Sequence, residues 1–92
     1  MRKIEQDMWN AINEGVNWSK DNTQVSQFKD TSEVFLHGHH IAGVHSYTGE
    51  LVVNKETLAN WPTNTTKSRL RALGADVTTK KGITYLDGEE VC

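Results

Sequence analysis

The residues of this chain best suited to chemistry are its four histidines, three of which fall within four consecutive positions. The segment reads His37-Gly38-His39-His40, and His45 follows five residues later. Neutral imidazole is a common ligand of divalent metals, so neighbouring histidines could share an ion. If Gly38 and His39 form a type II′ turn, His37 and His40 lie opposite each other on one face of a hairpin.

A metal site at this hairpin would be short of ligands. His39 would lie at the tip of the turn, and Glu33 would be the one carboxylate on the face of His37 and His40. A closed zinc site takes four ligands, and Cys92, the only cysteine, is the last residue of the chain. We therefore predict no bound metal and no other cofactor. We interpret His37 and His40 as part of a polar hairpin end and as a candidate binding surface.

A second group of residues with chemical potential is a basic segment in the C-terminal third. Between residues 61 and 84 the chain carries five cations and one acid, Asp76. The five cations are Lys67, Arg69, Arg71, Lys80 and Lys81. A helix N-terminus beside hydroxyls and cations is suited to binding an anion such as phosphate. At helical spacing, Lys67 and Arg71 would share an outward face, with Lys80 or Lys81 within reach and Arg69 pointing elsewhere.

Each of these features also has a purely structural interpretation. The basic segment has the composition of an ordinary solvated helix face, and Leu70 and Leu73 on the same helix would then face the core. Trp18, Trp61 and Tyr85 could stack on bases, but in so small a chain we expect them to fill the interior. No glycine-rich phosphate loop, nucleophile elbow or distinct carboxylate pair is present, so we do not expect an enzyme.

Length and composition set the class of the molecule. Ninety-two residues fit one domain spanning 1–92, and 36% hydrophobic residues are enough for a modest core. The net charge of −2 argues against strong nonspecific binding to nucleic acid. One cysteine excludes a disulfide framework, and Cys92 is expected to be inert. No apolar run approaches the length of a membrane span, so we expect a cytosolic monomer or homodimer.

The elements that must position these residues follow from hydrophobic periodicity. Residues 2–14 have helical spacing and end at Gly15, and residues 17–22 are predicted to be a loop. The period then becomes that of strands, with a single turn at residues 54–62 that ends at Pro62 and a second helix at about 65–73. The predicted strands are residues 23–28, 33–37, 40–46, 51–53, 76–79 and 83–86. The predicted fold class is α+β, with an N-terminal helix, an antiparallel four-stranded meander, a second helix and a C-terminal β-hairpin.

Three segments carry a resemblance to a known family. They are VFLHGHHIAGV at residues 34–44, LVVN at 51–54, and NWPTNTTKSRLRALGADVTTKKGITYLDG at 60–88. Together they resemble small proteins of tailed bacteriophages that share an HG-x-HIA hairpin and a TTKSRL-AL helix. The resemblance covers about residues 17–88, and His39 replaces the asparagine of the family at the hairpin turn. It implies a setting, a phage protein made in an infected bacterium, and no particular activity.

The sequence shows no arrangement of catalytic residues. Together with the phage setting, this predicts a small non-enzymatic protein that binds a host macromolecule. The expected partner is a host protein or nucleoprotein complex, and the expected effect is modulation or inhibition. Host takeover or anti-defence activity, such as inhibition of a CRISPR complex, would fit, and the host cytoplasm is the expected location. The alternative is a nucleic-acid-binding protein that uses the basic helix and hairpin. The host-binding hypothesis rests on the phage setting and the nucleic-acid hypothesis on charge, and neither hypothesis rests on a specific motif.

Overall fold

The structure is a computed structural model that describes residues 2–91. It contains three helices and eight strands, so the predicted α+β class is confirmed. In chain order they are α1 (Lys3–Glu14), β1 (Trp18–Lys20), β2 (Thr23–Phe28), β3 (Thr31–Leu36), β4 (His39–His45), β5 (Leu51–Val53), α2 (Lys55–Asn60), α3 (Asn64–Ala72), β6 (Val77–Lys80), β7 (Ile83–Leu86) and β8 (Glu89–Glu90). The prediction made for Cys92 concerns a residue outside this range.

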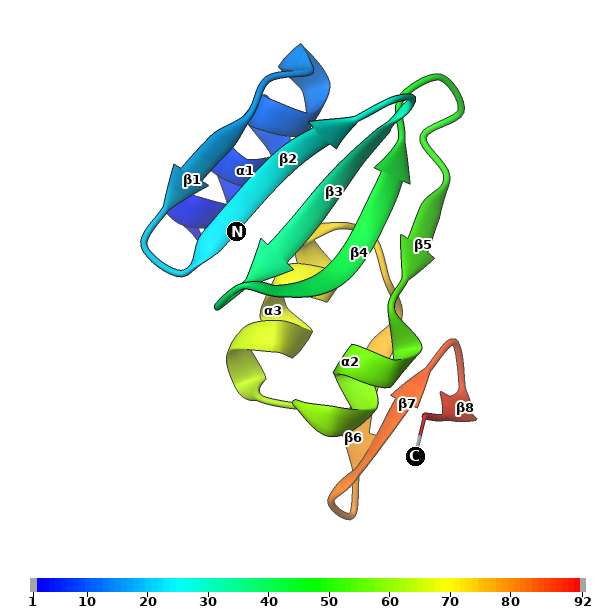
Figure 1. Cartoon of the computed structure of the whole chain (residues 1–92). Helices are drawn as coiled ribbons and strands as arrows, with labels where there is room; N and C mark the ends of the chain where they lie inside the picture. Colours follow the sequence, from blue (N-terminus) through cyan, green and yellow to red (C-terminus); the bar gives the residue numbers. More distant parts are fainter. Residues whose placement is uncertain (1, 92) are drawn as a thin grey trace.

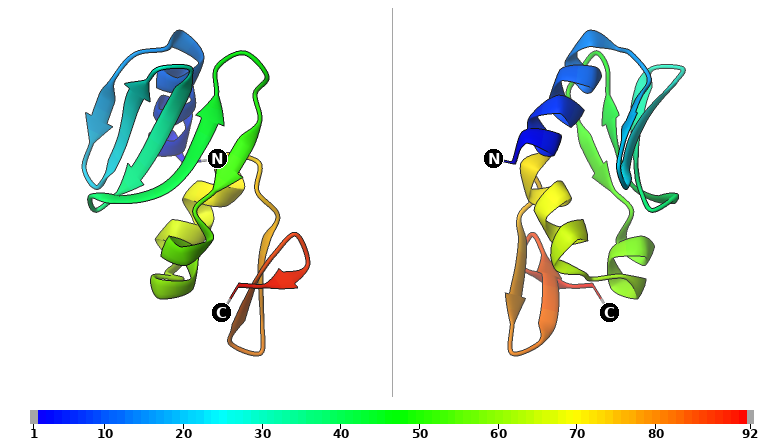
Figure 2. Two further views of the ribbon diagram at one scale, coloured as in Figure 1. Left: turned by 45° about the vertical axis from the view of Figure 1, so that its right-hand side comes forward. Right: turned by 90° about the vertical axis from the view of Figure 1, so that its left-hand side faces the viewer.

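The first five strands form one antiparallel sheet in the order β1-β2-β3-β4-β5. Helices α1 and α3 lie against the same face of this sheet, and α2 lies beyond one end of it (Figures 1 and 2). The last three strands form a separate small sheet in the order β6-β7-β8, below α3 in Figure 1. The molecule is therefore a sheet covered on one face, with a second sheet attached at the end where α2 lies.

Helix α1 forms because its apolar residues recur along one face. Met8 and Ala11 are fully buried against the sheet, and Ile12 packs beside them. Trp9 is half-buried, and its indole nitrogen donates to the carbonyl of Ala72 in α3. Gly15 ends the helix in the left-handed conformation, at φ 67°, as the sequence predicted.

Three elements were not predicted. The segment expected to be a loop contains β1, which pairs with β2 along its whole length. The predicted single turn is helix α2, which Asn54 caps by accepting a hydrogen bond from the amide of Thr57 at 3.1 Å. Strand β8 pairs with β7. All three are short, and short elements are stabilised by the neighbours they contact more than by their own periodicity.

The histidine hairpin has a different register from the predicted one. His37 and Gly38 both have positive φ, at 52° and 79°, so they are the central residues of a type I′ turn. Leu36 therefore pairs with His39 and Phe35 with His40, and a bulge follows on β4. The predicted type II′ turn and the pairing of His37 with His40 are wrong. Types I′ and II′ both match the twist of the strands, and the positive φ at His37 as well as Gly38 makes this turn type I′.

The core lies between the sheet and the helices. Ile41 from β4, Leu58 from α2 and Leu70 from α3 are at most 1% exposed and meet there with Met8. Leu73 is also buried, so the expected inward orientation of Leu70 and Leu73 is confirmed. Val77 and Leu86 attach the small sheet to this core. Within residues 2–91 no helix is both long enough and apolar enough to cross a membrane.

Candidate functional site

The predicted outward orientation of Lys67 is wrong. Its side chain is buried, with the whole residue 7% exposed, and Nζ donates to the hydroxyl of Thr79 on β6. The α3 face that carries Lys67 is covered by the small C-terminal sheet, which the sequence pattern of the helix alone does not show. Lys67 therefore helps to hold that sheet against α3 instead of contributing a free charge to the surface.

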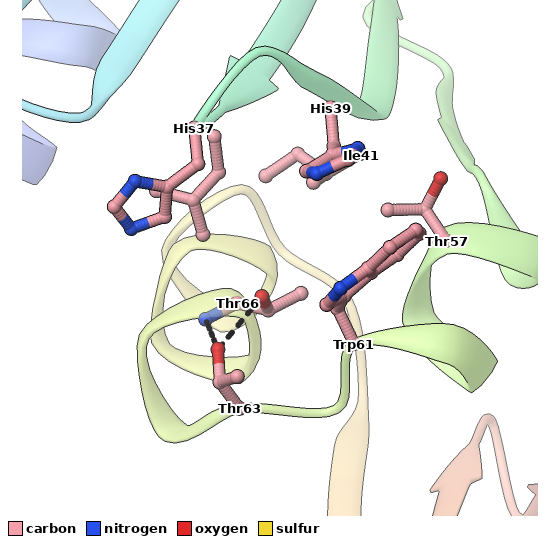
Figure 3. Close-up of a pocket in the computed structure, with 8 residues that line it drawn as sticks. His37, His39, Ile41, Thr57, Trp61, Thr63 and Thr66 are labelled. Atoms are coloured by element: carbon pink, nitrogen blue, oxygen red, sulfur yellow. Dashed lines mark hydrogen bonds between the residues drawn. The ribbon is translucent and has the colours of Figure 1, made fainter.

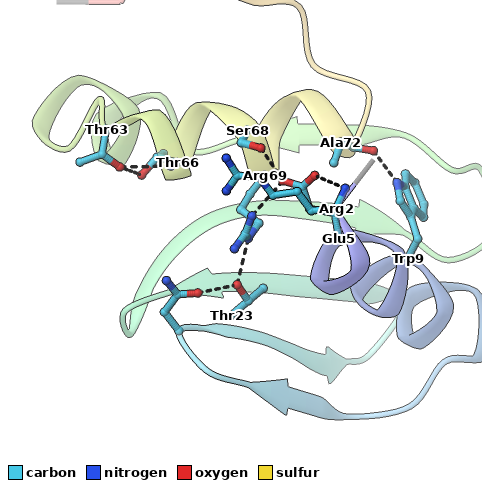
Figure 4. A network of polar contacts seen from close by, with 10 residues as sticks. Arg2, Glu5, Trp9, Thr23, Thr63, Thr66, Ser68, Arg69 and Ala72 are labelled. Carbon is cyan, nitrogen blue, oxygen red and sulfur yellow. Dashed lines mark hydrogen bonds and ion pairs between the residues drawn. The ribbon is translucent and has the colours of Figure 1, made fainter.

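Arg69 is buried as well and belongs to a structural network between α3, α1 and β2 (Figure 4). Its guanidinium lies 2.9 Å from Glu5 Oε2 and donates to the Thr23 hydroxyl at 3.0 Å. The Ser68 hydroxyl donates to the same carboxylate at 2.5 Å. Burial raises the pKa of Glu5, but the hydrogen bonds from Ser68 and Arg69 outweigh it and leave that pKa below its ordinary value. Glu5 is thus held charged in the interior by its partners.

The remaining cations of the basic segment stay at the surface. Arg71 is exposed, although its Nε donates to the backbone carbonyl of Val77 at 2.7 Å. Lys80 and Lys81 are exposed at the turn between β6 and β7. With Lys67 and Arg69 buried, the five predicted cations do not form one surface, because residues 67 and 69 face neighbouring elements.

The structure separates His40 from His37. His40 lies on the sheet face that carries no helix, where its Nε2 is 3.4 Å from Glu33 Oε2. Its Nδ1 is 3.2 Å from the Asn54 amide nitrogen. Because Asn54 uses its oxygen to cap α2, the group that faces His40 Nδ1 is the Asn54 NH₂. Among residues 2–91, no three His, Cys, Asp or Glu side chains gather closely enough to hold a metal ion.

His37 and His39 instead border a cavity of about 250 Å³ at the end of the hairpin (Figure 3). We call this cavity the tip pocket. Residues from β3, β4, α2 and the start of α3 line it, and they are Leu36, His37, His39, Ile41, Thr57, Trp61, Thr63 and Thr66. The pocket thus lies where the hairpin tip meets the two short helices.

An aromatic pair forms one wall of the tip pocket. The rings of His39 and Trp61 are stacked, with centroids 4.2 Å apart and planes inclined by 23°. Trp61 is the C-cap residue of α2, and its amide donates to the carbonyl of Thr57 at 2.8 Å. It is 46% exposed, so the expectation that it fills the core is wrong. Its ring lies against the hairpin and not against the apolar core, because α2 ends outside the sheet.

The sequence placed His37 at this site but missed the pocket. His39 was predicted to lie at the tip of the turn, and Trp61 was predicted to pack in the interior. The available signal was Pro62, because the residue before a proline is disfavoured in the helical conformation, which predicts that a helix ends by Trp61.

A family model described as Kyanoviridae Gp96 protein matches residues 1–92. No curated protein matches the chain, and no solved structure does.

Proposed function

The chain belongs to the Kyanoviridae Gp96 family of phage proteins, and from this premise we propose that it is a non-enzymatic protein that binds a host protein and modulates it. The proposed contact surface is the tip pocket with its aromatic wall. The proposed outcome is host takeover or inhibition of a host defence complex in the cytoplasm of the infected cell. The observation that supports this is the half-exposed Trp61, stacked on His39 at the mouth of an apolar cavity.

An exposed tryptophan beside a preformed cavity is typical of a protein-binding surface. Tryptophan is enriched among the residues that dominate binding energy, and such residues cluster at pockets that exclude water on binding. The cavity floor is Leu36 and Ile41, which are 3% and 1% exposed and are therefore held in place by the core. A rigid, preorganised surface loses little conformational entropy when a partner binds.

The test is capture of partners from bacterial lysates, infected and uninfected, with the purified chain as bait. Trp61→Ala is compared with Tyr47→Ala, because Tyr47 is 82% exposed in the loop at the far end of β4. A host protein that is enriched by the wild type and by Tyr47→Ala, and is lost with Trp61→Ala, is the expected result. Equal enrichment by all three baits would place the contact surface elsewhere, and no enriched protein from either lysate would contradict host binding.

Nucleic-acid binding is the alternative proposal, supported by the exposed Lys80 and Lys81 and by Arg71. Its test is a gel shift with DNA and RNA at low salt, using Lys80→Glu as the matched variant. Phosphate contacts would make log affinity for duplex DNA fall by about 0.9 per neutralised phosphate for each decade of salt. No shift at micromolar protein would rule the alternative out.

A further inference from the structure

The size of the tip pocket limits what can fill it. Its volume of about 250 Å³ is below the roughly 300–1,000 Å³ typical of sites for drug-sized ligands. One side chain or one ring fits such a cavity, whereas a whole cofactor does not. The occupant must therefore be a small part of a larger molecule, which agrees with a protein partner.

The lining of the tip pocket favours an uncharged, apolar occupant. None of the lining residues is Asp, Glu, Lys or Arg. The Thr63 and Thr66 hydroxyls lie 2.9 Å apart and hydrogen-bond each other, so one of their two O–H donors is already used. In Figure 3 the methyl group of Thr66 points into the cavity, toward Trp61. A charged group would lose its hydration here and would find only imidazole, indole and hydroxyl groups in return, with no carboxylate, lysine or arginine.

The rings at the pocket favour one class of apolar occupant over the others. His39 and Trp61 form a ring wall across the cavity from Thr63 and Thr66 (Figure 3). An aromatic occupant gains ring-to-ring contact in addition to the burial that any apolar group gains. The indole nitrogen of Trp61 lies on the cavity side, and no hydrogen bond joins it to the other residues drawn.

We propose that the tip pocket binds one aromatic side chain of the partner protein, an inference that rests on the proposed function and names the chemistry of its contact. A nucleobase is disfavoured, because the phosphate attached to it would find no lysine or arginine among the lining residues. An aliphatic side chain would fill the floor at Leu36 and Ile41 but would make no ring contact with Trp61.

The experiment uses small probes and needs no partner. The ¹⁵N-labelled chain is titrated with N-acetyl-phenylalaninamide, N-acetyl-leucinamide and adenosine monophosphate, and the indole N–H signals of its three tryptophans are followed by NMR. We expect the phenylalanine probe to shift the Trp61 signal with a Kd on the order of millimolar. Ring contact should make it bind about 2- to 12-fold more tightly than the leucine probe.

The variants locate the contact. Binding to the variants is followed by the backbone amide signals of the pocket residues, because Trp61→Leu removes the indole reporter. Trp61→Leu should abolish binding of the phenylalanine probe and His39→Ala should weaken it, while Tyr47→Leu leaves it unchanged. His39→Ala keeps the α2 cap intact, so it remains informative if Trp61→Leu disturbs the fold, which the dispersion of the amide spectrum reports.

Three results would overturn the inference: equal or tighter binding of the leucine probe, tighter binding of the nucleotide, or shifts confined to the other two tryptophans. Loss of a captured host protein with Trp61→Ala, without any probe binding, would leave the proposed function standing and reject the aromatic occupant.

Discussion

At the scale of single residues, some cations are buried and stabilise the fold, whereas others are exposed and could contact a partner. Arg69 and Glu5 are 64 positions apart in the chain yet form an ion pair in which both side chains are about 5% exposed or less. Removing one member of such a pair leaves the other charged and without its partner, which is more costly than losing a surface pair. The residue-scale predictions follow from this contrast.

The first prediction concerns Glu5→Gln. At pH 7 it should lower the free energy of unfolding by about 3–5 kcal/mol, because Arg69 loses its counterion. The folded-state pKa of Glu5 lies below the ordinary 4.5, so its stabilisation is complete above about pH 4.5 and is lost as pH falls through the lowered value. Urea unfolding measured from pH 7 to 2.5 should therefore show that the difference in free energy of unfolding between wild type and variant becomes smaller at acid pH.

The control for that measurement is Glu14→Gln, at the exposed end of α1. Its free energy of unfolding should stay within about 0.5 kcal/mol of the wild-type value at every pH. A gap for Glu5→Gln that does not change with pH would show that the carboxylate is not held charged by its partners.

The second prediction compares charge reversal at two lysines. Lys67→Glu should destabilise the chain by about 2–4 kcal/mol, because it puts an unpaired carboxylate where Nζ now contacts Thr79. Lys80→Glu, at the exposed turn, should change stability by less than about 0.5 kcal/mol. Thermal melts of both variants check this prediction. Equal melting temperatures would mean that the Lys67 side chain is exposed to solvent.

At the scale of elements, the tip pocket depends on a helix too short to be stable alone. Helix α2 has six residues, whereas isolated helices in water need roughly 12–15 to be even marginal. Asn54 caps its start and Trp61 ends it, and Leu58 anchors it in the core. The orientation of the Trp61 ring against His39 is therefore coupled to the cap at the other end of the helix.

The third prediction tests this coupling with Asn54→Ala. Loss of the cap should cost about 1 kcal/mol and should shift the indole signal of Trp61, although residue 54 does not line the pocket. Lys55→Ala, one position further on and exposed, is the control and should leave both unchanged. Urea unfolding and the tryptophan N–H spectrum measure the two effects. An unmoved Trp61 signal in Asn54→Ala would show that the ring is held by the hairpin alone.

At the scale of the whole molecule, the question is whether the two sheets unfold together. The radius of gyration is 12.5 Å, close to the value of about 12 Å expected for one domain of this length. The small sheet contributes Val77 and Leu86 to the common core and receives Lys67 from α3. From these contacts we expect the small sheet to unfold together with the large one.

The fourth prediction is a single unfolding transition. Trp fluorescence reports on the large sheet and α2, and the amide signals of Thr79 and Thr84 report on the small sheet. Both should give one urea midpoint, as expected for two-state unfolding. Earlier loss of the Thr79 and Thr84 signals would show that the C-terminal sheet opens on its own, in which case residues 1–92 are not one cooperative domain.

The sequence by itself determined the α+β class, the α1 and α3 helices with the end of α1 at Gly15, and the strands at residues 23–28, 51–53 and 83–86. These follow from local periodicity and from the turn chemistry of glycine, which act over a few residues. Membership of a phage protein family, expected from the resemblance, is confirmed by the family match, although that match does not bear on the particular motifs.

Only the tertiary structure decided which polar side chains remain exposed and able to contact a partner. Lys67 and Arg69 differ from Lys80 and Lys81 by what packs on them, and their partners Thr79 and Glu5 come from other elements. The tip pocket also needs a hairpin register set by a type I′ turn and a bulge, together with a helix that ends at Trp61. Such contacts join residues distant in the chain, and no local pattern encodes them, because burial is a property of the packed molecule.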